Sequence, residues 1–204
     1  MQLFESNQLW NFDVVDAANP YFQYKFSKRL GKADRPKGAG IYVWVANLKD
    51  GTKFVCYTGS YKNNKGLDDV YGQRWSMHIY SKTHRGVFFG FDSERKFSKR
   101  HLPIYEKYGF EVKPEWFEAR FTKSGSQAAA NRTEFSLKYW DELDMNNPFT
   151  ILWFPSELDG KEIERRETQQ LNPVVNAEIN KEWDASKSTM SIDETVALVE
   201  KVMS

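Results

Sequence analysis

The 204-residue chain contains one cysteine, Cys56, so an intramolecular disulfide is excluded. Its three histidines are not spaced as zinc ligands usually are. No run of about 18 apolar residues is present, and the first residues lack the basic and apolar segments of a secretory signal. These absences exclude disulfide scaffolds and zinc modules, and they predict a soluble, cytoplasmic protein that does not contact a membrane.

The composition fits one globular domain whose charges are unevenly distributed. Hydrophobic residues make up 40% of the chain and aromatic residues 16%, which is enough to bury a core. The net charge is +1, but residues 51–101 carry ten basic and four acidic side chains, a surplus of +6, and residues 157–204 carry six and eleven, or −5. The basic segment suits an anionic partner, although an unevenly charged solvated surface explains the same counts.

Two neighbouring segments predict a β-hairpin. Residues 41–46 and 53–60 are rich in β-branched and aromatic side chains, and the loop between them has Asp50 and Gly51 at its centre. This dipeptide favours a tight turn between antiparallel strands. We therefore predict that the two segments pair, with Asp50 and Gly51 as the central turn residues.

This register makes a specific prediction about two tyrosines. It places Trp44 opposite Tyr57, and it places Tyr42 opposite Gly59. Tyr42 and Tyr57 then lie diagonally on one face, with Cβ atoms about 7 Å apart or less. Gly59 supports them by leaving space beside the rings. Cys56 should point to the opposite face and belong to the core.

The segment after the hairpin predicts a helix within residues 67–82. Asp68 and Asp69 lie near its start, where their charges suit the positive end of the helix dipole. Arg74 and His78 are four residues apart, so both should project from one face.

The C-terminal part predicts one strand and two helices. Residues 149–154 form a short apolar run that Pro155 ends. A helix through residues 161–171 should end before Pro173. Residues 191–194 read Ser-Ile-Asp-Glu, a capping box that opens the last helix.

The other segments are predicted more coarsely. We expect a strand within residues 116–123 and a helix within residues 129–143. The N-terminal segment should pack on the core through four aromatic side chains, namely Trp10, Phe12, Tyr21 and Phe22.

Four groups of residues stand in one order along the chain. They are Gly40-Ile41-Tyr42, Tyr57-Thr58-Gly59, the pair Arg74 and His78, and Glu164 followed by Pro173 and Asn176. This ordered set resembles the signature of the GIY-YIG nuclease superfamily, and it covers residues 40–80 and 149–176. Thr58 stands where the family name has isoleucine, which keeps β-branching at that position.

The resemblance implies an α/β (α+β) fold in a single nuclease domain, with a small, mainly antiparallel sheet of three strands flanked by helices. It also implies Mg²⁺-dependent or Mn²⁺-dependent hydrolysis of DNA that leaves 5′-phosphate and 3′-hydroxyl ends. The nuclease core covers residues 38–84 and 149–176, with an N-terminal extension (1–37), an insertion (85–148) and a C-terminal helix region (177–204).

Each motif residue type suits one task in phosphodiester cleavage. By resemblance, Glu164 is the metal ligand, a hard oxygen donor for an ion that keeps several waters. Arg74 braces the phosphate oxygens with its planar guanidinium. Tyr42 is the general base or positions the water. Because a free phenol has a pKa of about 10, it needs His78 or Tyr57 to help carry its proton.

Competing and supporting residues accompany this set. Glu162 and Glu167 are rival carboxylates on the same predicted helix. The resemblance selects Glu164, because Pro173 follows it by nine positions and Asn176 by twelve, as in the family pattern. Asn176 is expected to fix the loop after the helix through bonds from its side chain to the backbone.

Double-stranded DNA is the expected partner, and basic side chains are candidates for contacting its phosphates. They are Lys62, Lys65, Arg95, Lys96, Lys99 and Arg100. A solvated loop explains the same cluster equally well.

The long extension and insertion favour a restriction-type or phage-type enzyme with sequence preference. One centre cuts one strand, so cleavage of both strands calls for a homodimer on DNA or for two visits. Two alternatives stay open: a structure-specific nuclease of DNA repair or recombination, and a non-catalytic nucleic-acid-binding module.

Overall fold

The computed structural model describes residues 1–14, 24–62, 69–76, 78, 102–109, 111, 134–135, 137–139, 141–158, 160–173, 176 and 185–204. The strands are β1 (Gln2–Glu5), β2 (Trp10–Val14), β3 (Tyr24–Lys28), β4 (Gly40–Asn47), β5 (Lys53–Tyr61) and β6 (Phe149–Pro155). The helices are α1 (Ser6–Leu9), α3 (Leu102–Lys107), α5 (Gly160–Leu171) and α6 (Ile192–Met203). Shorter turns are η1 (Lys32–Asp34) and η6 (Ala185–Lys187), which are 3-10 helices, and η2 (Tyr71–Trp75), which is a π-helix.

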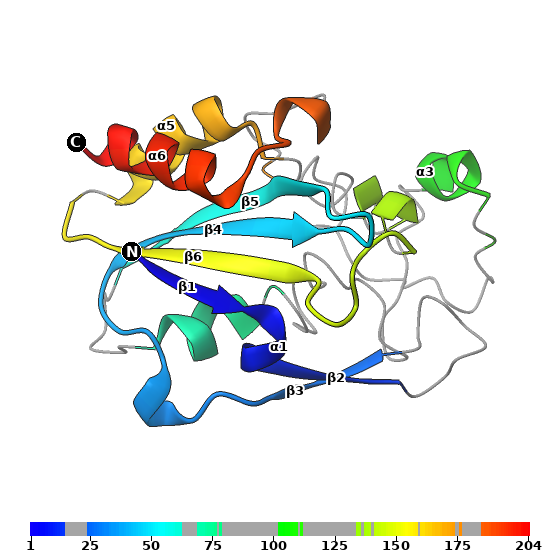
Figure 1. Ribbon diagram of the computed structural model, residues 1–204, viewed down its shortest axis with the longest axis horizontal. Coiled ribbons are helices and arrows are strands. Elements are labelled where there is room, and N and C mark those ends of the chain that lie inside the picture. The colour runs from blue at the N-terminus through cyan, green and yellow to red at the C-terminus, as the bar shows by residue number, and fades with distance from the viewer. Residues whose placement is uncertain are drawn as a thin grey trace.

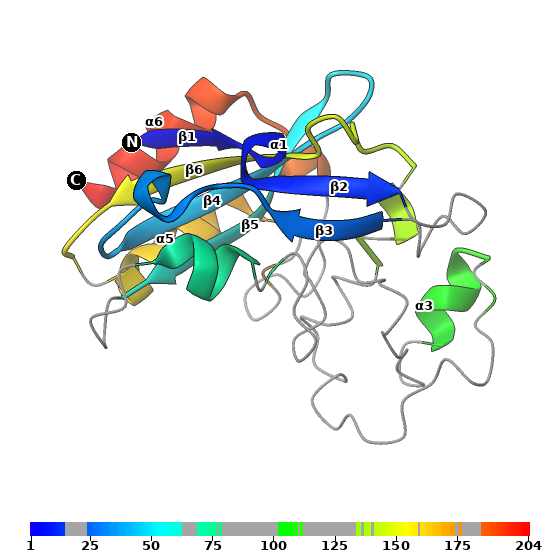
Figure 2. The same ribbon diagram turned by 90° about the horizontal axis from the view of Figure 1, so that it is seen from below.

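An antiparallel sheet of four strands forms the middle layer, in the order β1-β6-β4-β5. Helices α5 and α6 lie on one face of this sheet (Figure 1). The two-stranded ribbon β2-β3 and the π-helical segment η2 lie on the other face (Figure 2). This mixed architecture with a mainly antiparallel sheet agrees with the predicted α/β (α+β) class.

The predicted number of strands is wrong, because the N-terminal segment supplies a fourth. β1 pairs with β6, so that Leu3 lies opposite Leu152. Four residues are too few to show the period of two that identifies a strand. The partner strand lies near the other end of the chain, so β1 depends on a long-range contact that local pattern does not report.

The hairpin of β4 and β5 has the predicted pairing around the tyrosines. Trp44 lies opposite Tyr57, and Tyr42 lies opposite Gly59. The turn differs from the predicted two-residue form, because residues 48–52 make a longer loop between the strands. Two backbone hydrogen bonds close that loop. The Leu48 N–H donates to the Thr52 carbonyl at 2.9 Å, and the Gly51 N–H donates to the Leu48 carbonyl at 3.0 Å.

A β-bulge in β5 restores the predicted register. Val45 pairs with Val55 whereas Trp44 pairs with Tyr57, so Cys56 is the additional residue. The prediction that Cys56 points away from Tyr57 is therefore wrong, since both side chains belong to one buried cluster. The prediction that Cys56 is a core residue is confirmed: it is fully buried, and its thiol donates to the Trp44 carbonyl at 3.2 Å.

Alternation along β4 divides the core into two clusters. Tyr42 and Trp44 face the layer of η2 and β2, where Trp75 and Trp10 pack against them. Ile41 faces the opposite cluster beneath α5 and α6. All residues of β4 are buried, because both faces of the sheet are covered.

Three local predictions in the C-terminal part are confirmed. The run at 149–154 lies in β6, and α5 ends at Leu171. Asn172 follows with a φ of 47°, a left-handed conformation that stops the helix. Ser191 caps α6 and accepts a hydrogen bond from the backbone of Glu194, which completes the capping box.

The remaining predictions are only partly covered by the described residues. Trp10 is buried as predicted. Of the helix predicted within 129–143, residues 134–135 and 137–139 are helical, but the predicted end is wrong, because residues 141–142 form a turn and Leu143 makes a β-bridge with Leu48. Residues 21 and 22, the side chain of residue 12 and the strand within 116–123 lie outside what the structure describes. In the described ranges, no helix is long and apolar enough to cross a membrane.

Candidate active site

The Tyr42 hydroxyl lies at the centre of the candidate site. It is hydrogen-bonded to Nε2 of His78 at 3.0 Å. The ring centroid of Tyr57 is 6.1 Å from that of Tyr42 and 4.7 Å from the imidazole centroid of His78. Three rings from two strands and one helical segment therefore form a compact group.

Gly59 provides the space that Tyr42 occupies. A Cβ atom built on residue 59 would lie 2.5 Å from the Tyr42 hydroxyl oxygen and 2.5 Å from its Cζ. No real Cβ contact is this short, so a larger residue would displace the ring. The predicted space beside the tyrosines is thus present, and only glycine preserves it.

Arg74, on η2, acts electrostatically on the same hydroxyl. The backbone N–H of Ser76 donates to the Tyr71 carbonyl, which is the spacing of a π turn. Arg74 is exposed and its charge acts on the Tyr42 hydroxyl, whereas His78 is buried and is hydrogen-bonded to it at 3.0 Å. Both residues thus act on Tyr42, in agreement with the prediction that they project from one face, although the π turn that carries Arg74 was not predicted.

The environment of Tyr42 decides its protonation state. Burial raises the pKa of Tyr42 well above its usual value, and the nearby Tyr57 raises it further. The nearby Arg74 guanidinium lowers the pKa of Tyr42 without cancelling this rise. Tyr42 is therefore a neutral phenol near pH 7, and it could serve in proton transfer only with a neighbour that accepts its proton.

Glu164 approaches this group from the opposite face of the sheet. Its Oε2 accepts a hydrogen bond from the Ser60 hydroxyl at 2.5 Å. Burial raises the pKa of Glu164, while the Ser60 hydrogen bond and the charge of Arg74 lower it. The charge of Glu164 also acts on Tyr42. Because β5 is at the edge of the sheet, the charge of a group on one face can act on groups of the other face around it.

Ser60 is a site residue that the sequence analysis missed. Strand alternation alone places it on the face opposite Gly59, toward the helix that follows β6. Its contact with Glu164 depends on how α5 crosses β5. A Cβ atom built on Gly160, the first residue of α5, would lie 3.0 Å from the Ser60 Cβ, which shows how closely the helix approaches the strand.

The three carboxylates of α5 have different surroundings. Glu162 forms ion pairs with Arg165 and Arg166 at the surface. Glu167 is fully buried, and neither of its oxygens has a hydrogen-bond partner among the residues that the structure describes. Burial, followed by the charge of Glu164, raises the pKa of Glu167 to about 9. Only Glu164 is in electrostatic contact with both Arg74 and Tyr42, which is the arrangement expected for the selected carboxylate.

Asn176 makes the predicted bonds from its side chain to the backbone. Its Oδ1 accepts from the Thr58 N–H at 2.8 Å, and its Nδ2 donates to the Thr58 carbonyl at 2.8 Å. These two bonds resemble those that a neighbouring strand would make with the edge strand β5. Asn176 therefore ties the chain after α5 to the strand that carries Tyr57 and Gly59.

The donor chemistry of the site fits a hard divalent cation. Glu164 offers carboxylate oxygen and Ser60 offers hydroxyl oxygen, and Mg²⁺ commonly takes one or two protein ligands and keeps several waters. No cluster of three or more His, Cys, Asp or Glu side chains that could enclose a metal occurs in the described part of the chain. Glu164 is thus the residue that would hold Mg²⁺ or Mn²⁺ here.

The predicted DNA-contacting residues are only partly described. Lys62 is exposed directly after the end of β5. Residues 65, 95, 96, 99 and 100 lie outside the described ranges.

Comparison with known proteins found no match: no family model, no curated protein and no solved structure is similar to this chain. The resemblance to the GIY-YIG superfamily therefore remains a prediction from the motif residues.

Proposed function

We propose that this protein is a GIY-YIG-type endonuclease that hydrolyses phosphodiester bonds of double-stranded DNA with Mg²⁺ or Mn²⁺. One observation carries the proposal. The Tyr42 hydroxyl is hydrogen-bonded to His78, and the charges of Arg74 and Glu164 both act on it. A proton acceptor, a phosphate-binding cation and a metal-binding carboxylate are thus gathered at one place.

The raised pKa of Tyr42 favours a role as a proton relay over a role as the general base. A neutral phenol is a poor base, so Tyr42 acts as a relay that takes a proton from the attacking water as it passes its own to Nε2 of His78. This relay requires the His78 tautomer that has its proton on Nδ1. The water oxygen then bonds to phosphorus as the bond from phosphorus to the 3′ oxygen breaks.

Two charged groups complete the reaction. The guanidinium of Arg74 holds the non-bridging phosphate oxygens, where negative charge must be stabilised in the transition state. Glu164 would hold the divalent ion, which would supply positive charge for the departing 3′ oxygen. The long segments outside the motif residues support an enzyme of the restriction or phage type that prefers a target sequence.

Cleavage of supercoiled plasmid tests this function. Wild-type protein should convert the plasmid to nicked and linear forms with Mg²⁺ or Mn²⁺, and a chelator should stop the reaction. The products should be ligatable, because they carry 5′-phosphate and 3′-hydroxyl ends. If folded protein binds the DNA but does not cleave it with either metal, the protein is a binding module and the proposal is wrong.

Replacing Tyr42 by phenylalanine tests the relay. The ring stays in the core, but the hydroxyl that links water to His78 is lost, so kcat should fall by about 100-fold or more while the affinity for DNA is kept. In the wild type the rate should level off below about pH 10, because His78 and not the tyrosinate accepts the proton. Tyr139→Phe, a buried tyrosine of the same cluster, is the matched control and should keep full activity. A Tyr42→Phe enzyme as active as the control would exclude the relay.

A further inference from the structure

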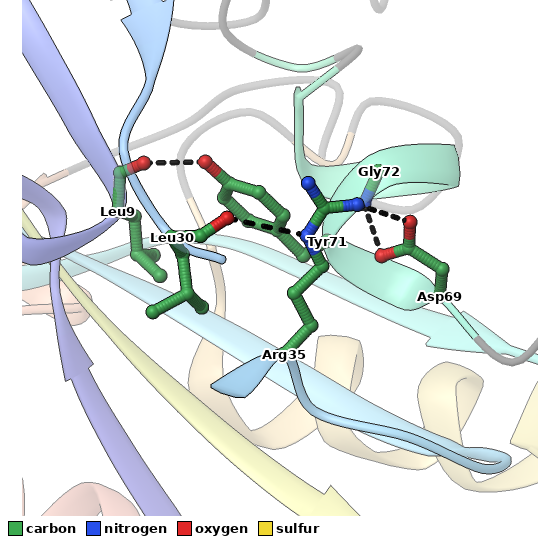
Figure 3. A network of polar contacts seen from close by, with 6 residues as sticks. All are labelled: Leu9, Leu30, Arg35, Asp69, Tyr71 and Gly72. Carbon is green, nitrogen blue, oxygen red and sulfur yellow. Dashed lines mark hydrogen bonds and ion pairs between the residues drawn. The ribbon is translucent and has the colours of Figure 1, made fainter. Parts of the chain in front are cut away.

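Arg35 lies outside the motif residues, but it contacts the segment that carries Arg74 and His78. Its Nη1 donates to Asp69 Oδ2 at 2.7 Å, and its Nε donates to the Leu30 carbonyl at 3.3 Å (Figure 3). The Arg35 side chain is 14% exposed and that of Asp69 is 31% exposed. The ion pair is therefore partly shielded from water, and a second bond fixes the guanidinium in place.

Asp69 connects Arg35 to the first turn of this helical segment. Its Oδ1 accepts a hydrogen bond from the backbone N–H of Gly72 at 2.7 Å, and its carbonyl accepts from the backbone of Gln73 at 2.9 Å. A Cβ atom at residue 72 would lie 2.2 Å from Asp69 Oδ2, so this close approach requires glycine. The carboxylate thus holds Arg35 with one oxygen and the helix backbone with the other.

Tyr71 makes a second connection between Arg35 and the start of η2. The Arg35 guanidinium carbon is 5.0 Å from the centre of the Tyr71 ring, within the range of a cation–π contact. The Tyr71 hydroxyl donates to the Leu9 carbonyl (Figure 3), and its ring stacks on Trp10 with centroids 5.5 Å apart. The start of η2 is therefore fixed on two sides to residues far from the motif.

We propose that Arg35 is a positioning residue for the candidate site. By holding Asp69 and Tyr71 at the start of η2, it sets the direction in which Arg74 on η2, and His78 four residues further on, are presented to the Tyr42 hydroxyl. The expected effect of Arg35 on kcat rests on the proposed nuclease function, whereas its expected effect on the position of His78 does not. A π turn has a less favourable backbone geometry than an α-helix, so contacts outside the turn must maintain it.

The kinetic test is the Arg35→Ala variant. A small displacement of Arg74 and His78 disturbs the transition state more than substrate binding, so kcat should fall about 10- to 100-fold with KM for plasmid within about 2-fold. Arg29→Ala is the matched control, because Arg29 comes from the same segment but donates to the Asn7 carbonyl. An unchanged kcat in Arg35→Ala, or an equal loss in the control, overturns the proposal.

A double-mutant cycle with His78→Gln distinguishes positioning from a general structural role. If Arg35 acts through His78, its removal should cost little further activity once His78 is replaced. The same cycle with Arg74→Ala tests the other positioned residue, and losses that multiply in both double variants overturn the proposal. Should Arg35→Ala fail to fold, Asp69→Asn takes its place, because asparagine keeps the acceptor for the Gly72 N–H but loses the ion pair.

A structural readout separates this inference from the proposed function. The ring ¹⁵N signals of His78, assigned by their absence in His78→Gln, report the tautomer and the hydrogen bond with Tyr42. Arg35→Ala should shift these signals while Arg29→Ala leaves them in place. This test needs no cleavage, so a wild type without nuclease activity removes the proposed function but not the positioning role. Unchanged His78 signals in Arg35→Ala overturn the inference.

Discussion

Replacing Glu164 by glutamine is expected to lower the rate of DNA cleavage by about 1,000-fold, the largest effect of any single substitution that we predict. Glutamine keeps the shape of the side chain and an oxygen that accepts the Ser60 hydrogen bond. It loses the negative charge that holds the divalent ion. The fold and the affinity for DNA should therefore survive while the chemistry is lost.

Single-turnover cleavage with saturating Mg²⁺ measures this effect, and binding to DNA in Ca²⁺ shows whether affinity is kept. Glu162→Gln is the matched control, because it makes the same change on the same helix at an exposed position. Among the described residues, Glu162 forms ion pairs with Arg165 and Arg166 at the surface, so its replacement should change the rate less than about 2-fold. Equal rates for the two variants would show that Glu164 is not the metal ligand.

Replacing Glu167 by glutamine is expected to stabilise the protein by about 3 kcal/mol at pH 7. The wild-type carboxyl is fully buried, and its pKa is raised from 4.5 to about 9 by burial and by the charge of Glu164. The folded protein therefore holds a proton that the unfolded chain has released at pH 7. Glutamine is neutral in both states, so the variant avoids this cost.

The sign of the effect sets its dependence on pH. Because the folded pKa is higher, protonated Glu167 contributes full stability below about pH 4.5, and this contribution is lost as the pH rises toward 9. Wild-type stability should thus fall by about 1.4 kcal/mol per pH unit over this window relative to Glu167→Gln. Urea unfolding at pH 5, 7 and 8.5 measures the difference. Two proteins of equal stability at all three values would show that Glu167 is not held as the neutral acid.

Local signals in the sequence determined the elements that carry the candidate site. The capping box at Ser191 fixed the start of α6, and Asn172 before Pro173 fixed the end of α5. The register of Tyr42 opposite Gly59 also followed from the sequence, although the longer loop and the bulge at Cys56 are two departures that compensate. These features depend on residues a few positions apart, which pattern and turn chemistry describe.

Tertiary structure alone decided which residues of these elements meet. β1 joins the sheet through β6, Ser60 meets Glu164 across 104 residues, and Arg35 meets Asp69 across 34. The different burial and partners of the three carboxylates on α5 also depend on how the helix lies against the edge strand β5. Such contacts form because both faces of the sheet must be covered by other segments before its apolar side chains are buried. The way in which these distant segments cross the sheet has no signature in the local sequence.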